Sequence, residues 1–160
     1  MTRLLLGVNH AFLFLCVSMY LGTGGSLVLF TFPIAPQLTV DNYYLQFVPQ
    51  VTAATAFFTT MTKLMLVAGV VMLVSEWKRG VKWVPIVVLA AVVAATVLTE
   101  VKILPINEQM AAGIHDGERL HSVLGEWMSM NRIRTALWCV QWTAMMAYFG
   151  RTYFKLGRAL

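Results

Sequence analysis

The chain has 160 residues, of which 59% are hydrophobic and only 12% charged, and its formal net charge is +5. A soluble globular domain carries about 25% charged residues, so this composition excludes an ordinary water-soluble fold and indicates an integral membrane protein. The basic residues cluster at the ends of apolar runs and form no separate basic and aromatic patch, which argues against nucleic acid as a partner.

Four apolar runs are long enough to cross a hydrocarbon core about 30 Å thick. We predict an all-α fold, a single four-span domain over residues 1–160 that forms an antiparallel four-helix bundle in the membrane. Cys16 and Cys139 fall inside apolar runs and are expected to be buried free thiols. The predicted spans cover about 4–32, 51–75, 83–104 and 133–154.

Basic residues near the span ends predict the orientation of the chain. The side opposite the predicted cytoplasmic side also has basic residues, but acidic residues accompany them there. We therefore expect a multi-pass protein with both termini cytoplasmic. The residues that mark the cytoplasmic side are Arg3, Lys78, Arg79, Lys82, Arg151, Lys155 and Arg158.

Lys63 stands in the middle of the second predicted span. At 1.5 Å per residue it lies roughly 18 Å from either end of its helix, which is beyond the reach of its own stem. An intramembrane charge usually has a functional role, so we predict a polar pocket in the outer half of the bundle with Lys63 near its floor. A structural ion pair with Glu100 is the alternative. A hydroxyl stripe leads from the outer surface to Lys63 and consists of Thr52, Thr55, Thr59 and Thr62.

The other spans repeat this asymmetry, with apolar inner parts and polar outer parts. In the first span, "LGTGGSL" places Gly22 and Ser26 four residues apart, a spacing typical of close helix packing in lipid. Gln141 of the fourth span lies at a depth comparable with that of Lys63. The outer polar residues are Thr96, Thr99 and Glu100 in the third span and Asn131, Arg134, Thr135, Trp138 and Gln141 in the fourth.

The segment 105–131 is expected to be a long amphipathic outer loop between the third and fourth spans. Its apolar residues Leu120, Val123, Leu124 and Trp127 recur at helical spacing, which predicts a stretch lying over the bundle mouth as a lid. The loop also holds histidines and carboxylates, which bind a metal when they converge and are otherwise solvated loop residues. They are His115, His121, Glu108, Asp116, Glu118 and Glu126.

Three short motifs resemble the anthrone oxygenase-like membrane family. They are "GTGGSLVLFTFPIAP" in the first span, "LPIN" at the end of the third, and the tryptophan, asparagine and Arg-Thr pattern of "WMSMNRIRTALW". The resemblance covers nearly the whole chain and brings forward Asn107, Trp127, Asn131 and Arg134. Some relatives carry histidine where this chain has Asn131. Without the resemblance, Asn107 would be a turn residue, Trp127 an interfacial anchor, and Arg134 the partner of a loop carboxylate.

The resemblance implies an enzyme that converts an aromatic, polyketide-derived anthrone to a quinone with dioxygen, without an organic cofactor; a metal is left open. His121 or Glu100 would be the base, with Arg134 and Lys63 stabilising the oxyanion. Trp127 and Trp138 would stack on the flat substrate, with Asn107, Asn131 and Gln141 as further binding residues. The alternative is a non-catalytic accessory subunit or a protein that binds a lipid or quinone; either could form oligomers.

Overall fold

The computed structural model of the protein describes residues 3–157, and every regular element in that range is a helix. Two of the helical runs are interrupted by π-helical turns, at Leu27–Thr31 and Thr99–Ile103, and a short 3-10 turn spans Ala35–Gln37. Arg158, one of the residues used to predict the orientation, lies outside the described range. The α-helices are α1 (Arg3–Ser26), α2 (Phe32–Ile34), α3 (Tyr43–Glu76), α4 (Trp83–Leu98), α5 (Leu104–Ala111) and α6 (Gly117–Gly157).

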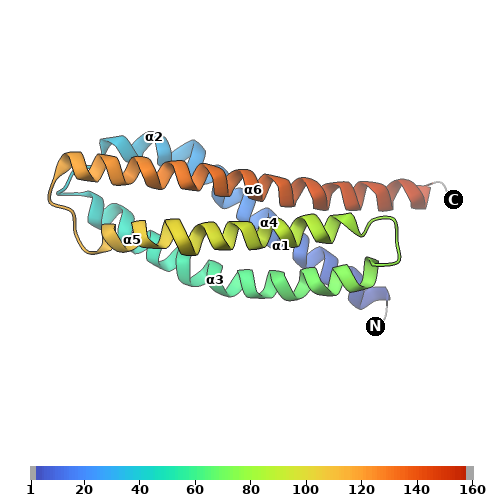
Figure 1. Ribbon diagram of the computed structural model, residues 1–160. Coiled ribbons are helices and arrows are strands. Elements are labelled where there is room, and N and C mark those ends of the chain that lie inside the picture. The colour runs from blue at the N-terminus through green and yellow to red at the C-terminus, as the bar shows by residue number, and fades with distance from the viewer. Residues whose placement is uncertain (1–2, 158–160) are drawn as a thin grey trace.

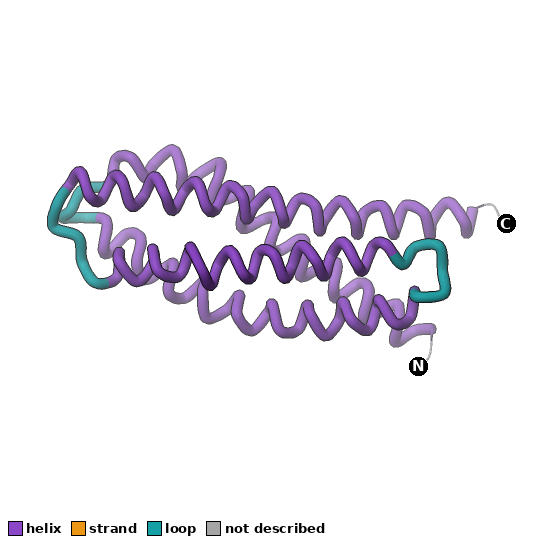
Figure 2. The backbone as a smooth tube through the Cα atoms, viewed as in Figure 1, coloured by secondary structure: helices purple, strands orange, loops and turns teal. Residues whose placement is uncertain are grey.

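The long helices α1, α3, α4 and α6 lie along one another (Figure 1). Both termini lie at one end, together with the connection 77–82, and we call this the terminal end. The connections 38–42 and 112–116 lie at the opposite end, here called the loop end (Figure 2). Within the described range, α6 packs against α1 and α4, and α3 packs against the same two helices.

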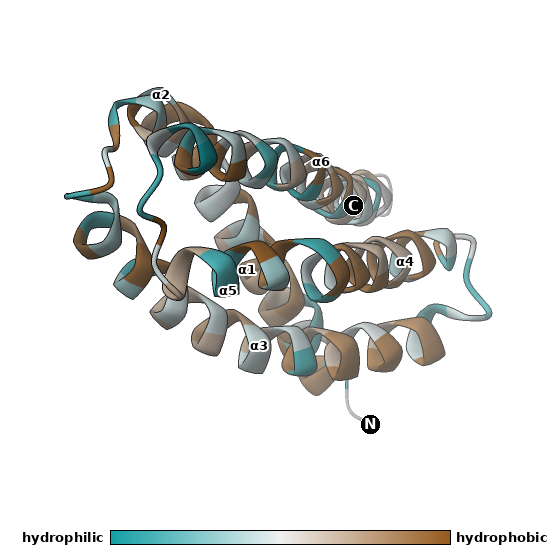
Figure 3. Ribbon diagram, turned by 60° about the vertical axis from the view of Figure 1, so that its left-hand side comes forward, coloured by the Kyte–Doolittle hydropathy of each residue, from teal (hydrophilic) through white to brown (hydrophobic). Residues whose placement is uncertain are grey.

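Three continuous helical runs are long and apolar enough to cross a bilayer: Arg3–Gln37, Tyr43–Glu76 and Trp83–Ala111. Figure 3 shows brown, hydrophobic residues along α4 and much of α3, with teal concentrated in the loops and along parts of α6. The predicted fourth span lies within α6, which has polar residues such as Arg134 and Gln141 and does not satisfy the same criteria. That span stays a prediction.

Each π-helical turn is followed two residues later by a proline. Pro33 follows the turn Leu27–Thr31, and Pro105 follows the turn Thr99–Ile103. A proline inside a helix donates no hydrogen bond and its ring clashes with the carbonyl four residues earlier, which here falls within the widened turn in both cases. The widened turns therefore let the helices continue past the prolines toward the loop end.

The predicted long outer loop is wrong, because the structure makes most of it helical. Residues 112–116 are the only non-helical part between α5 and α6. Gly113, with φ +93°, occupies the left-handed region that ends many helices. The Asp116 carboxylate accepts hydrogen bonds from the backbone N–H groups of Glu118 and Arg119, both at 3.3 Å, and so caps the start of α6.

The predicted lid is also wrong, although the helical spacing behind it is correct. α6 runs without a break through the lid segment and onward to Gly157. The apolar side chains of this segment face inward and join an apolar cluster inside the loop end, so the segment is part of the bundle itself and not a separate lid lying over its mouth. The cluster includes Phe32, Phe47, Ile103, Ile106, Met110, Leu120, Val123, Leu124 and Trp127.

A second apolar cluster fills the half of the bundle toward the terminal end. Leu13 of α1, Met72 of α3 and Met145 of α6 are each 0% exposed, so this part is dry as the apolar inner sequence predicts. Cys16 is buried here, whereas Cys139 lies on the exposed face of α6, against expectation. The interior is thus divided into two separate apolar cores.

The close approach between α1 and α6 uses Gly24 and not the predicted pair Gly22 and Ser26. A Cβ atom on Gly24 would lie 2.8 Å from side-chain atoms of Thr135 and Trp138. A Cβ atom on Gly22 would meet nothing within 4 Å, and Ser26 is exposed. The glycine-rich segment therefore does pack closely against another helix, as predicted, but it does so through the helix face that carries Gly24.

Gly24→Ala should destabilise the protein, because the added methyl group collides with the rigid Trp138 ring. Overpacking of this kind costs about 1–3 kcal/mol, which outweighs the helix propensity gained. Gly25→Ala is the matched control, since a Cβ there meets nothing within 4 Å. Thermal unfolding in detergent, followed by circular dichroism, should show a lower midpoint for Gly24→Ala and an equal or higher one for Gly25→Ala. Equal midpoints for the two variants would contradict this packing.

Candidate functional site

A cavity of about 820 Å³ separates the two apolar cores. Its wall is built by α1, α3, α4, α5, α6 and both π-helical turns, so all four long helical runs contribute side chains. Volumes of roughly 300–1,000 Å³ are typical of sites for drug-sized ligands. The charged residues of the wall are Lys63, Glu100 and Arg134.

Seven of the nine residues proposed from the sequence line this one cavity. Lys63 comes from α3, Glu100 from the widened turn after α4, and Asn107 from α5. The other four come from one face of α6. They are Trp127, Arg134, Trp138 and Gln141.

Arg134 is held by α6 and by the widened turn. Its Nη1 donates to Thr99 Oγ1 at 3.3 Å, and its Nη2 donates to Asn131 Oδ1. The guanidinium lies over the Trp138 ring, with 4.8 Å between Cζ and the ring centroid. Thr99 in turn donates to the carbonyl of Ala95 at 2.8 Å, so its lone pairs stay available to Arg134. These contacts fix the plane of the guanidinium against a flat aromatic surface.

No carboxylate neutralises Arg134. Within the described side chains the single ion pair joins Arg79 to Glu76, so neither Arg134 nor Lys63 is salt-bridged. Arg134 Nε and Gln141 Oε1 are both buried and have no hydrogen-bond partner in the described part of the chain. Because buried polar groups are normally paired, this wall of the cavity has unused donor and acceptor capacity. The predicted pairing of Arg134 with a loop carboxylate is therefore wrong.

Trp127 closes the cavity toward the loop end. Its Nε1 donates to Asn107 Oδ1 at 3.1 Å, and its ring makes edge contacts with Phe32 and Phe47 at centroid distances of 5.8 and 4.7 Å. Trp127 is 3% exposed, which excludes the interfacial-anchor interpretation. Asn107 lies within α5 and is not a turn residue. Trp127 is thus not an interfacial anchor and Asn107 is not a turn residue. The two side chains are instead hydrogen-bonded to each other.

Lys63 lines the cavity, but its side chain is exposed on the flank of α3. Glu100 is exposed as well and forms no ion pair with Lys63, so the direct structural pair is wrong. Of the predicted hydroxyl stripe, all but Thr52 line the cavity. Thr55 and Thr59 donate to backbone carbonyls of their own helix at 2.8 Å, which leaves their oxygens able to accept.

Two of the proposed residues do not line the cavity. Asn131 lies behind the wall, 0% exposed, where its Nδ2 donates to the Trp127 carbonyl at 2.8 Å while its Oδ1 accepts from Arg134. It therefore positions Arg134. His121 is exposed on α6, away from the cavity wall. Among residues 3–157 no three histidine, cysteine or acidic side chains converge as a metal site would require.

Tyr20 is a cavity residue that the sequence reasoning missed. Its hydroxyl donates to the Phe58 carbonyl at 2.9 Å and is hydrogen-bonded to Thr62 Oγ1 at 2.5 Å, which ties α1 to α3. Its ring also packs edge-on against Trp138, 5.0 Å away. The one sequence signal was an aromatic hydroxyl in the middle of an apolar span.

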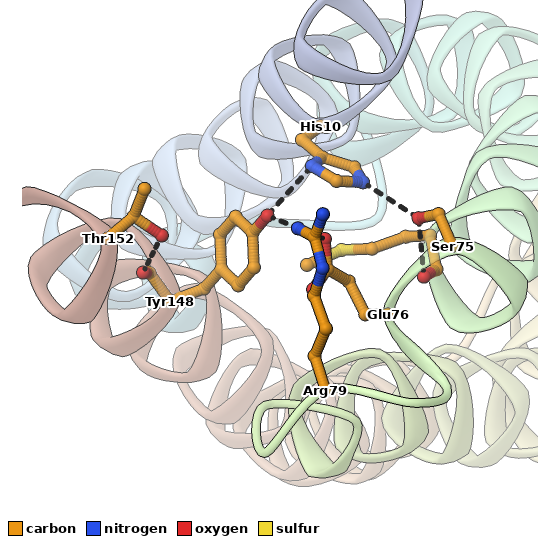
Figure 4. A network of polar contacts seen from close by, with 7 residues as sticks. His10, Ser75, Glu76, Arg79, Tyr148 and Thr152 are labelled. Carbon is orange, nitrogen blue, oxygen red and sulfur yellow. Dashed lines mark hydrogen bonds and ion pairs between the residues drawn. The ribbon is translucent and has the colours of Figure 1, made fainter. Parts of the chain in front are cut away.

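A second polar cluster lies at the edge of the dry core, to which Tyr148 belongs. Figure 4 shows how its side chains meet. The Tyr148 hydroxyl donates to Glu76 Oε1 at 3.1 Å and lies 3.0 Å from His10 Nδ1, and Arg79 pairs with the same carboxylate oxygen at 3.1 Å. Because the one hydroxyl proton goes to Glu76, His10 Nδ1 is assigned as the N–H donor. His10 Nε2 lies 3.4 Å from Ser75 Oγ.

This cluster brings together residues that the sequence reasoning missed. His10 is buried and has polar partners on α3 and α6. Its carboxylate is Glu76, at the end of α3, which is 2% exposed. The cluster joins α1, α3 and α6 and stands apart from the cavity, so we assign it to the assembly of the helices.

Tyr148→Phe should destabilise the protein, because it leaves buried Glu76 and His10 without their shared hydroxyl. Leaving buried polar groups unsatisfied costs about 1–3 kcal/mol. Tyr153→Phe is the control, since Tyr153 is 75% exposed. Denaturant unfolding in detergent should show a lower free energy of unfolding for Tyr148→Phe alone. Unchanged stability in both variants would show that the cluster is not needed to hold the three helices.

No protein-family model, no curated protein and no solved structure matches this chain. The resemblance described from its motifs stays a prediction, and the cavity is the basis on which a function is proposed.

Proposed function

We propose that the chain is an integral membrane protein, an antiparallel four-helix bundle whose fourth span lies within α6. Three apolar runs of sufficient length support this placement. The terminal end carries Arg3 and the basic connection 77–82, so it would face the cytoplasm under the positive-inside rule. The cavity would then lie within the outer half of the bilayer.

We further propose that the cavity binds a flat aromatic molecule with an acidic or electron-rich oxygen, and that the protein oxidises an anthrone-type substrate to a quinone with dioxygen. The observation that carries this proposal is Arg134, an unpaired guanidinium fixed against Trp138 in the cavity wall. Arginine stacks on aromatic faces and offers donors to oxyanions. A planar phenol or enol presents both features together.

The reaction needs a base, an oxyanion site and dioxygen. A base removes a proton from the methylene carbon of the anthrone, and the negative charge spreads onto the carbonyl oxygen, where Arg134 stabilises it. The carbanion forms a carbon–oxygen bond with dioxygen, which gives a hydroperoxide after protonation. Loss of the remaining hydrogen on that carbon, with cleavage of the oxygen–oxygen bond, yields the quinone and water.

Glu100 is the better of the two proposed bases. Its carboxylate belongs to the cavity wall, whereas the His121 imidazole is exposed elsewhere on α6. A general base must come within hydrogen-bond reach of the proton it removes, directly or through one water. Lys63, which α3 contributes to the cavity wall, supplies a second cation for the developing charge.

A non-catalytic protein that binds a quinone or lipid is the second candidate. The observation that favours it is that no histidine belongs to the described cavity wall, so the imidazole that such chemistry often uses is missing from the site. Under this interpretation the same Arg134 and Trp138 surface holds the ligand, and its loss changes affinity or assembly without any change in turnover.

The two candidates are separated by measuring oxidation of emodin anthrone in proteoliposomes, as oxygen consumption and quinone absorbance above autoxidation. Arg134→Gln should lower kcat/KM by about 10²-fold, the usual loss when an oxyanion donor is removed. Lys63→Met should cause a smaller loss. Arg132→Gln and Lys102→Met are matched controls, because both side chains are exposed and outside the cavity wall.

Both control variants should keep the wild-type rate at equal folded concentration. If wild-type protein is no faster than autoxidation but binds emodin, and Arg134→Gln weakens that binding, the oxygenase proposal fails and the binding role stands. If Arg132→Gln is as damaging as Arg134→Gln, the loss reflects charge near the loop end and not the cavity.

A further inference from the structure

The helical run Arg3–Gln37 and α3 are held together at two levels along the cavity. Toward the terminal end, the Tyr20 hydroxyl bonds the Phe58 carbonyl, and the two rings lie 4.7 Å apart. Toward the loop end, Phe32 and Phe47 both pack on Trp127. Phe47 and Phe58 are 11 residues apart along α3, a length of about 16 Å at 1.5 Å per residue. Between these levels no hydrogen bond or ring contact joins the described side chains of the two helices.

The rim of this interval is formed by side chains that both line the cavity and are exposed. Phe57 on α3 is 52% exposed, and Met19 on α1, which borders the interval one residue before Tyr20, is 41% exposed. Gly22 and Gln50 continue the two edges and are exposed as well. A residue with both properties marks a place where the cavity opens to the outside. Lys63 and Glu100 mark a second, charged opening on the α4 side of α3, whereas the opening between α1 and α3 has an uncharged rim. We call this opening the α1/α3 window.

We infer that the cavity is entered sideways through the α1/α3 window, from the hydrocarbon of the bilayer, and that its ligand is a lipid-dissolved amphiphile. The inference rests on the membrane placement proposed above. Both edges of the window belong to runs that are long and apolar enough to span a bilayer. Leu29 and Phe30, which follow the α1 edge, are 67% and 66% exposed, so the surface beside the window suits lipid and not water.

The alternative entrance from water at the loop end is blocked. Phe32, Phe47 and Trp127 are 6%, 5% and 3% exposed and form a continuous apolar closure over the cavity. The hydrogen bond from Trp127 to Asn107 fixes this closure to α5. A polar solute arriving from water would have to open this core, whereas a molecule dissolved in lipid meets an open rim.

The polarity of the cavity sets the orientation of the ligand. Apolar Met19 and Phe57 stand at the window, while Arg134 and Gln141, with their unpartnered buried atoms, belong to the α6 wall. An amphiphile therefore enters with its oxygen-bearing end first and leaves its apolar part toward lipid. Gly22 keeps the window wide because it has no side chain. A Cβ atom there would meet nothing within 4 Å, so a larger residue would narrow the window.

A bulky residue at the window tests the route. Emodin, a planar hydroxyanthraquinone, is delivered from phosphatidylcholine vesicles, and its association with the reconstituted protein is followed by quenching of tryptophan fluorescence. Gly22→Leu should slow association by about tenfold or more, within the range that single interface changes produce. Gly25→Leu is the matched control. A Cβ atom at Gly25 also meets nothing within 4 Å, as at Gly22, but Gly25 is not part of the cavity wall. Equal rates for the two variants would overturn the window.

Spin labelling tests the environment of the window without any ligand or turnover. In a Cys139→Ser background, labels at Gly22→Cys and Gly25→Cys are compared by power saturation with oxygen and with a water-soluble nickel chelate. The label at position 22 should be accessible to oxygen and protected from nickel, and emodin should reduce its oxygen accessibility while leaving position 25 unchanged. Strong nickel accessibility would mean a water-filled entrance, and protection from both reagents would mean that another chain covers the window; each result overturns the inference.

These measurements test entry through the α1/α3 window independently of the proposed oxidation. The spin-label pattern does not depend on oxidation, so a protein that fails to oxidise emodin anthrone can still show a lipid-facing window. Conversely, normal oxidation by Gly22→Leu together with nickel access at position 22 would leave the proposed reaction intact and remove the lateral entry.

Discussion

An unpaired guanidinium surrounded by apolar helices is the constraint on which the rest of this structure depends. Among residues 3–157 no carboxylate pairs with Arg134, and its contacts are an amide, a hydroxyl and an aromatic face. Isolated charge inside a protein is costly unless polar groups compensate for it. Asn131 is 0% exposed and points its oxygen at the guanidinium, so part of the core of α6 is arranged to hold one charge in one orientation.

The two apolar cores explain how a cavity persists beside that charge. The core toward the terminal end is close-packed around Leu13 and Met72, and the core toward the loop end is packed around Trp127. Arg134 lies at the edge of the first core, over the Trp138 ring, at the level where α3 touches α1 through Tyr20. The cavity therefore exists because the two apolar cores, one toward each end, hold the four long helices apart between them.

The sequence predicted the chemistry of the site better than its shape. Hydropathy identified the three apolar runs, and polar residues at helical spacing brought Lys63, Glu100 and Gln141 to one cavity. Spacing within one helix could not tell which neighbour each face meets, so Gly22 was assigned to packing when Gly24 has that role.

Other errors have equally local causes. The segment 105–131 is rich in charge and was predicted as a loop, because hydropathy does not separate an exposed polar helix from a coil. Its inward face nevertheless buries Leu120 and Leu124. The terminal-end cluster was missed because His10, Glu76 and Tyr148 come from three helices, and no pattern along the chain relates residues that are 66 and 72 positions apart.

The paired prolines have a mechanical consequence. Pro33 and Pro105 each follow a widened turn, and each turn divides a continuous helical run into one part that belongs to the terminal-end core and another that belongs to the loop-end core. A π-helical turn is a usual place for a helix to bend. Its hydrogen bonds join residues five apart, whereas those of the α-helix on either side join residues four apart. The geometry of the two turns therefore sets how the loop-end core sits relative to the terminal-end core, and with it the height of the cavity between them.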